Sequence, residues 1–212
     1  MKEVSSLFKY LRLTKGLLGA NTYICYDDET REAAIIDAGN KPDDVNNLVV
    51  ENNLDVRYII LTHAHYDHIF YVEQYKMLYP KAPVVLHEDD SSFMQNPRLN
   101  ASIYFGPEKR FPECDVKVRD LSRLPLGGGE LVFYSTPGHT TGSVCVQAGS
   151  LLFTGDTLFY GGFGRTDLGA GDMSQMAASI DRLYDMDPEL CVLPGHGTKS
   201  TIGYEKENNP FI

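Results

Sequence analysis

The sequence predicts an α/β fold assembled from two similar halves. β-rich and helical patterns alternate along the first half, which is typical of sheets covered by helices. Each half also runs through a hairpin, a helix and a buried strand that leads to a histidine, in "YIILTHAH" and again in "CVLPGH". The repeated order favours an internal duplication, although few residues are identical between the halves.

The first half begins with a hairpin, because two β-rich runs in residues 21–37 flank the polar turn 27–30. A helix follows, since Pro42 suits a first helical turn and apolar residues then recur at Val45, Leu48 and Val49. The other elements expected in this half are a buried strand over residues 56–61, a helix over about 68–79 and a strand over 82–87.

Residues 91–114 break this pattern, because prolines and a glycine stand among aromatic residues. We expect short helices and loops there, inserted over one face of a single domain that spans residues 1–212. The second half then resumes with a strand, a hairpin, a helix and a strand. These elements are expected within residues 131–139, 142–156, 174–186 and 191–196.

Composition excludes several classes of protein. The formal charge is -10, from 29 acidic and 19 basic residues, and no basic stripe is present to bind nucleic acid. Charges at Lys2, Glu3, Lys9 and Arg12 interrupt any signal peptide, and no run approaches the ~18 apolar residues of a membrane span. We expect a cytoplasmic protein with reduced cysteines and without a nucleic-acid or membrane partner.

Histidines gather where strands give way to loops. Five of the six occupy such junctions, and only His87 does not clearly do so; the five are His63, His65, His68, His139 and His196. If the first two continue the strand before them, their spacing points both imidazoles to one face. The turn that follows would present Asp67 and His68 nearby, so "LTHAHYDHIF" can supply ligands to two metal ions.

Later residues could complete both sites. His139 with a carboxylate would complete one, and His196 with Asp156, at the end of "LLFTGD", would complete the other. Imidazole with carboxylate suits zinc, iron or manganese, and the absence of cysteine ligands disfavours a closed structural zinc site. Two such ions about 3.5–4 Å apart would generate hydroxide at neutral pH and clamp an attacked oxygen.

The segments "THAHYDH", "TPGHTTGS", "FTGDTLF" and "PGHG" resemble the ordered motifs of the metallo-β-lactamase superfamily, and within it the glyoxalase II-like hydrolases. The resemblance covers nearly the whole chain and implies a four-layer αββα sandwich built from two internal repeats. It implies two divalent metal ions, zinc first and iron or manganese as alternatives. One ion would take His63, His65 and His139, the other Asp67, His68 and His196, with Asp156 between them. Asp37 in "IIDAG" would orient the ligand loop, and a simple turn carboxylate is the alternative reading.

Three further segments resemble small glyoxalase II-like proteins: "NPRLNASIYFG", "GFGRTDLGAGD" and "TIGYEKENNPF". The resemblance implies a hydrolase in which a metal-bound hydroxide attacks an acyl thioester of the hydroxyacylglutathione type and Asp67 orients that nucleophile. Arg165 would bind an anionic group of the substrate or pair with Asp167. Authentic glyoxalase II continues into a helical glutathione-binding domain that this sequence lacks, so we leave glutathione recognition open.

Two alternative functions stand beside this one. "GRTD" also resembles the persulfide dioxygenases, which use a single iron, but His196 in "PGHG" favours two metals and hydrolysis. Hydrolysis of a lactone or another ester is the second alternative. Phe70 and Tyr71 replace a glycine pair of glyoxalase II, so they could alter the helix, wall the pocket and change substrate choice, or pack in the core. A monomer and a homodimer are both compatible with the sequence.

Overall fold

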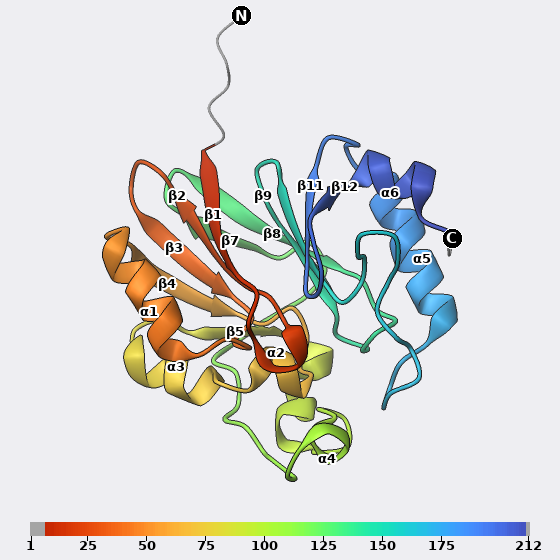
Figure 1. The fold of residues 1–212 in the computed structure, drawn as a ribbon, viewed down its shortest axis with the longest axis horizontal. Helices are drawn as coiled ribbons and strands as arrows, with labels where there is room; N and C mark the ends of the chain where they lie inside the picture. Colours follow the sequence, from red (N-terminus) through yellow and green to blue (C-terminus); the bar gives the residue numbers. More distant parts are fainter. Residues whose placement is uncertain (1–6, 211–212) are drawn as a thin grey trace, which may run out of the picture.

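The computed structural model describes residues 7–210 and contains two six-stranded sheets packed face to face (Figure 1). The first sheet has the order β1 (Phe8–Leu13), β2 (Thr22–Asp27), β3 (Glu32–Ile36), β4 (Asp55–Ile60), β5 (Val84–His87) and β6 (Val116–Val118). The second has the order β12 (Ser200–Thr201), β11 (Cys191–Pro194), β10 (Leu151–Gly155), β9 (Val144–Ala148), β8 (Gly129–Ser135) and β7 (Arg123–Leu126).

Helices cover both outer faces, which completes four layers. Helices α1 (Pro42–Glu51) and α3 (Val72–Leu78) lie on the first sheet, and α5 (Met173–Tyr184) and α6 (Ile202–Asn208) lie on the second (Figure 1). In each half an antiparallel hairpin is followed by a helix and then by a strand parallel to the second hairpin strand. The structure therefore confirms the αββα sandwich and its repeated order.

Side chains along β2 alternate between two apolar clusters, one on each face of the first sheet. Tyr23 and Cys25 belong to the apolar cluster between the two sheets, whereas Ile24 and Tyr26 belong to the cluster under α1 and α3. Successive side chains of a strand point to opposite faces, so every residue of this strand is buried. A third cluster fills the space between the second sheet and its helices.

Helix α5 shows how the sequence pattern becomes packing. Met176, Ile180 and Leu183 recur with helical spacing and are fully buried in the third cluster. The Asp172 side chain caps the helix by accepting a hydrogen bond of 3.0 Å from the Gln175 backbone N–H. The expected helix over 174–186 is confirmed, with its start one residue earlier.

Two expectations around the histidine motif were wrong. Strand β4 ends at Ile60, so His63 and His65 lie in a loop and not on the strand. The expected helix over 68–79 is two helices, α2 (Tyr66–Ile69) and α3, and α2 already contains Asp67 and His68. The break arises because the Tyr71 backbone N–H donates to Ala38 O at 2.9 Å, instead of continuing the ladder of α2.

The insert over residues 91–114 consists of short helices and loops, as expected. It contains most of the 3₁₀ segment η2 (Glu88–Gln95) and the single turn α4 (Ser102–Phe105). Strands β1, β6, β7 and β12, the turn η1 (Leu17–Gly19) and helix α6 carried no sequence prediction. No helix within residues 7–210 is long and apolar enough to cross a membrane. Lys2 and Glu3 in the N-terminal stretch and Phe211 in the last motif lie outside the described residues.

Candidate functional site

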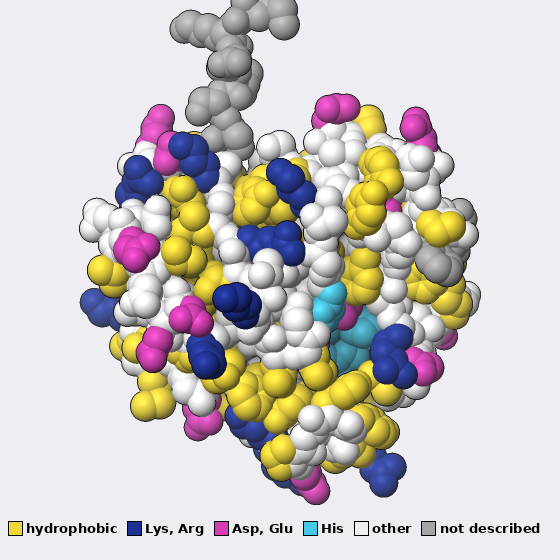
Figure 2. All heavy atoms as spheres, in the orientation of Figure 1, with side chains coloured by type: hydrophobic (Ala, Val, Ile, Leu, Met, Phe, Trp, Pro, Cys, Tyr) yellow, Lys and Arg dark blue, Asp and Glu magenta, His cyan; other side chains and the backbone are white. Residues whose placement is uncertain are grey.

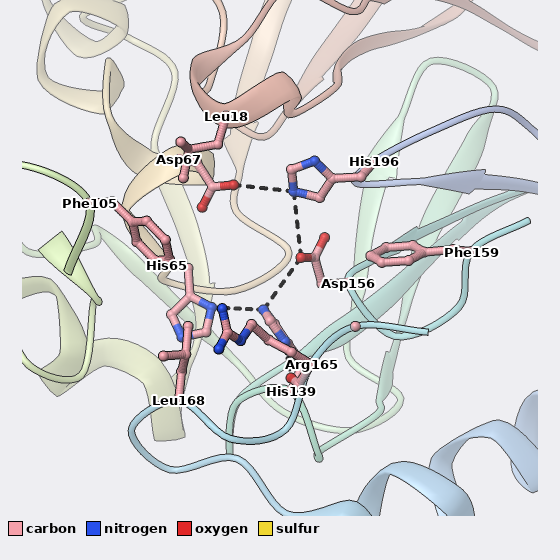
Figure 3. A pocket seen from close by; sticks show the side chains of 11 residues that line it. Leu18, His65, Asp67, Phe105, His139, Asp156, Phe159, Arg165, Leu168 and His196 are labelled. Carbon is pink, nitrogen blue, oxygen red and sulfur yellow. Dashed lines mark hydrogen bonds and ion pairs between the residues drawn. The ribbon is translucent and has the colours of Figure 1, made fainter. Parts of the chain in front are cut away.

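Loops at one end of the two sheets bring together every residue expected to ligate a metal. Figure 3 shows five of these residues, His65, Asp67, His139, Asp156 and His196. The loop after β4 and the short helix α2 supply the first four, and loops after β8, β10 and β11 supply one each. The seven residues are His63, His65, Asp67, His68, His139, Asp156 and His196. Their ligand atoms form three overlapping groups, in each of which all atoms lie within 4.8 Å of one another.

Three buried histidines form the first group. His65 Nδ1 lies 2.7 Å from His139 Nε2, and the His63 ring lies 4.9 Å from that of His65 and 4.7 Å from that of His139. Burial, followed by the charges of neighbouring histidines, lowers the pKa of His63 and of His65 well below the ordinary value. These imidazoles are therefore neutral near pH 7, which is the form that binds metal.

Asp67, His68 and His196 form the second group. His196 Nε2 lies 3.2 Å from Asp67 Oδ2 and 3.2 Å from His68 Nε2. Asp156 stands between the groups, because its carboxylate is 3.4 Å from His139 Nε2 and 3.4 Å from His68 Nε2. A single carboxylate therefore faces both groups.

The outer nitrogens of these histidines are held by other groups. Asp37 Oδ2 accepts from His68 Nδ1 at 2.8 Å, and His139 Nδ1 donates to the Arg165 carbonyl at 2.6 Å. The hydroxyl of Thr62 is 3.1 Å from His63 Nδ1 and donates to Asp37. Such partners fix the ring orientation and the tautomer, so the inner nitrogens point into the site. Asp37 thus lies where the sequence placed it, beneath the ligand loop.

The carboxylates and histidines of the second group strongly influence one another's pKa values. Burial would lower the pKa of His68, but the carboxylates of Asp67, Asp156 and Asp37 overcome this effect and raise it to about 10. Burial would raise the pKa of Asp67, but His68 and His196 hold it well below the ordinary value. In the absence of a metal ion, protonated imidazole therefore compensates the clustered carboxylates.

The donor set fits divalent metal ions. His63 Nε2 and Asp156 Oδ1 are buried and have no hydrogen-bond partner, which is costly unless another group satisfies them. A tetrahedral ion with bonds of about 2.0–2.1 Å to nitrogen places its ligand atoms roughly 3.3 Å apart. The measured separations between donors of neighbouring residues, 2.7 to 3.6 Å, lie around that value. The cluster is therefore suited to a binuclear centre.

Gly195 leaves room for Asp156 and His68 to lie close to each other. Its position in "PGHG" was the only indication of this role in the sequence. A Cβ at this position would overlap Asp156 Oδ1 and lie 2.7 Å from His68 Cε1. We expect Gly195→Ala to displace the bridging carboxylate and to lower kcat/KM by about 10²-fold, as a shift of about 1 Å at a reacting centre does. Gly128→Ala is the control, because its Cβ would meet only ordinary contacts at 3.6 Å or more. Equal activity of the two variants would contradict the placement of Asp156.

Asp90 connects the two ligand loops and was not predicted from the sequence, where it stands in a row of acidic residues with Glu88 and Asp89. This fully buried carboxylate accepts from Ala64 N at 2.9 Å, Thr140 Oγ1 at 2.8 Å and Gly142 N at 2.7 Å. Ala64 lies between two ligand histidines, and Thr140 follows a third. One side chain thus joins the loop of the first half to that of the second.

Removal of this carboxylate should loosen both loops. We expect Asp90→Ala to destabilise the fold by about 3 kcal/mol, because three buried donors lose their acceptor. Metal affinity should fall roughly 10–100-fold, as for other groups that support metal ligands. Denaturant unfolding and metal titration would measure the two effects, with Asp89→Ala as the control because that neighbouring side chain is 59% exposed. Unchanged metal affinity would show that the loops hold their geometry without Asp90.

A cavity of about 240 Å³ opens beside the cluster (Figure 3). Besides five of the ligand residues it is lined by Gly164, Arg165 and four apolar side chains, Leu18, Phe105, Phe159 and Leu168. Arg165, which was expected to bind substrate, lines the cavity. Its Nε and Nη2 donate hydrogen bonds of 2.6 and 2.8 Å to the Asp167 carboxylate. The alternative reading, an Arg165–Asp167 pair, is thus what the structure contains. Phe105, Phe159 and Leu168 lie in segments already quoted for their resemblance, but the sequence did not place them beside the ligands, and Leu18 lies in no such segment.

Phe70 and Tyr71 do not line this cavity, which corrects the expectation that they wall the pocket. Both pack against the core cluster of the first half, and the Phe70 ring lies 5.1 Å from that of Tyr66 and 4.6 Å from Lys109 Nζ. The insert instead reaches the cavity through Phe105. His87 also lies outside the site, with Nε2 2.9 Å from Ser135 Oγ.

Comparison with known proteins gives a consistent result. The family model of the metallo-β-lactamase superfamily matches residues 16–196. The "Probable metallo-hydrolase YqgX" of Bacillus subtilis is 33% identical, over 96% of this chain and 97% of that protein. The "Hydroxyacylglutathione hydrolase GloC" of Haemophilus influenzae is 31% identical, over 91% of this chain and 92% of that protein.

Solved structures agree with the described architecture. The "BLEG-1 B3 metallo-beta-lactamase" superposes with a TM-score of 0.89 at 32% identity, over 96% of this chain and 99% of that one. "TTHA1623 in a di-iron-bound form" superposes with a TM-score of 0.84 at 32% identity, over 95% of this chain and 100% of that one. "ETHE1 from Myxococcus xanthus" superposes with a TM-score of 0.77 at 31% identity, over 96% of this chain and 83% of that one.

Proposed function

Because this chain belongs to the metallo-β-lactamase superfamily, we propose that it is a binuclear metal-dependent hydrolase of acyl thioesters. The observation that carries the proposal is the pair of ligand groups joined by Asp156, next to an open cavity. A closed metal site with a structural role would leave no room for a substrate. Hydrolysis forms a C–O bond from water, breaks the C–S bond and releases a carboxylate, a thiol and a proton.

The chain's own residues would hold and orient the reactants. His63, His65 and His139 would hold one ion, Asp67, His68 and His196 the other, and Asp156 would bridge them. Bound there, two divalent ions supply a hydroxide at neutral pH and polarise a carbonyl oxygen. Asp67, which lines the cavity, would orient the nucleophile through its free oxygen. Asp37 and Thr62 would fix the rings of His68 and His63.

The finer points of the proposal rest on different observations. Thioester hydrolysis is supported by the similarity to the hydroxyacylglutathione hydrolase. Histidine and carboxylate ligands are compatible with zinc, and the di-iron form of a similar structure makes iron the main alternative. Lactones and other esters are further candidate substrates, because the same ions would polarise their carbonyl groups. The four cysteines, all free thiols, support a cytoplasmic location.

A persulfide dioxygenase function is the second candidate, favoured by the structural similarity to ETHE1. The second ligand group argues against it here. The ligand atoms of Asp67, His68 and His196 lie within 4.8 Å of one another, as those of the first group do, and a single iron would leave them without an ion.

Metal analysis beside substrate assays tests the proposal. We expect two ions per chain, and hydrolysis of S-lactoylglutathione or of a simpler acyl thioester that is lost on chelation. One iron per chain with oxygen consumption on glutathione persulfide would overturn it in favour of the second candidate. Two ions with turnover of a lactone alone would retain the hydrolase and reject the thioester.

A further inference from the structure

The walls of the cavity are mainly apolar. Leu18 comes from η1, Phe105 from the insert, and Phe159 and Leu168 from the segment between β10 and α5, so three separate regions of the chain contribute. Figure 2 shows hydrophobic surface bordering the hollow in which histidine side chains are visible. Leu18 and Phe105 are 53% and 42% exposed and both line this cavity, and grouped exposed apolar side chains mark ligand-binding grooves.

Leu18 supports a binding role in a second way. Its backbone has a φ of 52°, in the left-handed region that non-glycine residues seldom occupy. This conformation costs free energy, yet it holds an apolar side chain at the mouth of the cavity instead of in the core. Strain of this kind concentrates at ligand-binding positions.

Lysine and arginine side chains are scarce in the same cavity. Arg165 is the only one of these among the described residues that line it, and its Nε and Nη2 are hydrogen-bonded to Asp167. The hydrogen bonds from Arg165 lower the pKa of Asp167 to about 2, so this partner stays ionised and keeps the guanidinium neutralised. Asp67 and Asp156 would be neutralised by the metal ions that they hold, so away from the ligand cluster the described lining has no charged side chain except Arg165.

We infer that the cavity selects thioesters of short, uncharged aliphatic acids, with the carbonyl at the ligand cluster and the alkyl chain against Phe159, Leu168 and their apolar neighbours. The inference rests on the proposed function. Burial of methylene groups gives this pocket its binding energy, and an acyl carboxylate finds no free cation among its side chains. A volume of about 240 Å³ restricts the buried part to a short chain.

The first test compares acyl groups on one uncharged thiol, N-acetylcysteamine. For the metal-loaded protein, kcat/KM should rise about fourfold per methylene from acetyl to butanoyl, which is the factor expected for burying one methylene. Succinyl, which ends in a carboxylate, should be at least tenfold poorer than butanoyl. A flat series, or a preference for succinyl, would overturn the inference.

Variants identify the residues responsible. Phe159→Ala and Leu168→Ala should reduce the gain per methylene, whereas Leu78→Ala, an exposed leucine of α3 far from the cavity lining, should leave it unchanged. Asp167→Asn should free Arg165 and raise kcat/KM for the succinyl thioester severalfold without changing that for butanoyl. Loss of both activities to the same extent in Asp167→Asn would indicate a structural pair only and would count against the inference.

A binding measurement separates this inference from the proposed function. Thioether analogues, in which a methylene replaces the carbonyl, cannot be hydrolysed, and their affinities can be measured by calorimetry. Tighter binding of the butyl than of the carboxypropyl thioether would support the apolar selection by itself. If that preference held while no thioester was hydrolysed, the pocket assignment would stand and the proposed function would fall. Equal or reversed affinities with normal thioester hydrolysis would overturn the pocket assignment and leave the proposed function standing.

Discussion

Replacement of His68 by alanine should remove one of the two metal ions and lower kcat for thioester hydrolysis by about 10³-fold. His68 Nε2 lies 3.2 Å from His196 Nε2 and 3.4 Å from Asp156 Oδ1, so its loss leaves the second group with two donors and a shared carboxylate. The first group, around His63, should keep its ion. Elemental analysis of the purified variant, together with steady-state kinetics, measures both effects.

The control for this variant is His87→Ala. His87 is also buried and hydrogen-bonded, yet it lies outside the ligand groups, so its replacement should reduce stability without changing metal content. Two ions retained in the His68 variant would contradict the ligand assignment. Loss of both ions would show that the two positions cannot be filled independently.

Removal of both ions by a chelator should abolish activity and also destabilise the fold. An ion present at about 1,000 times its dissociation constant stabilises the folded chain by about 4 kcal/mol. For a chain of this length, about 1 kcal/mol shifts Tm by about 2–4 °C, so each ion should raise Tm by roughly 8–16 °C. Calorimetry before and after chelation measures the shift, and added zinc should restore it.

The double variant His63→Ala/His68→Ala is the matched control for chelation. It should lack high-affinity metal sites, so the chelator should leave its Tm unchanged. A Tm of the unmodified protein that does not respond to chelation would imply that the buried donors of His63 and Asp156 are satisfied in some other way.

The candidate ligand residues were predictable because they stand in short motifs. "HxHxDH" contains four of them, in the loop after β4 and in helix α2, and their partners each follow a recognisable buried strand. The local geometry was not predictable. His63 and His65 converge through the loop after β4, not through strand alternation, and helix α2 is interrupted by a backbone contact with Ala38 that lies 33 residues away from Tyr71.

The supporting residues illustrate the limit of sequence reasoning more sharply. Asp90 is indistinguishable in sequence from the exposed Asp89 beside it, and only the tertiary fold gives it three buried donors. Leu18 lies in no recognised motif, and only the tertiary fold brings it to the same cavity as Leu168, which comes from a distant part of the chain. Long-range contacts of this kind leave no periodic trace in the sequence.

The division of the proposed ligands between the halves would make each metal ion a reversible cross-link. His65 and His139 are 74 positions apart, and His68 and His196 are 128 apart, so each ion would close a long stretch of chain. Closing long loops restricts the unfolded ensemble most strongly. In hydrogen exchange, the amides of both sheets should therefore open as one cooperative unit when the ions are bound. Without them, the two sheets should exchange at separate rates, as two neighbouring units that share only the apolar layer between them.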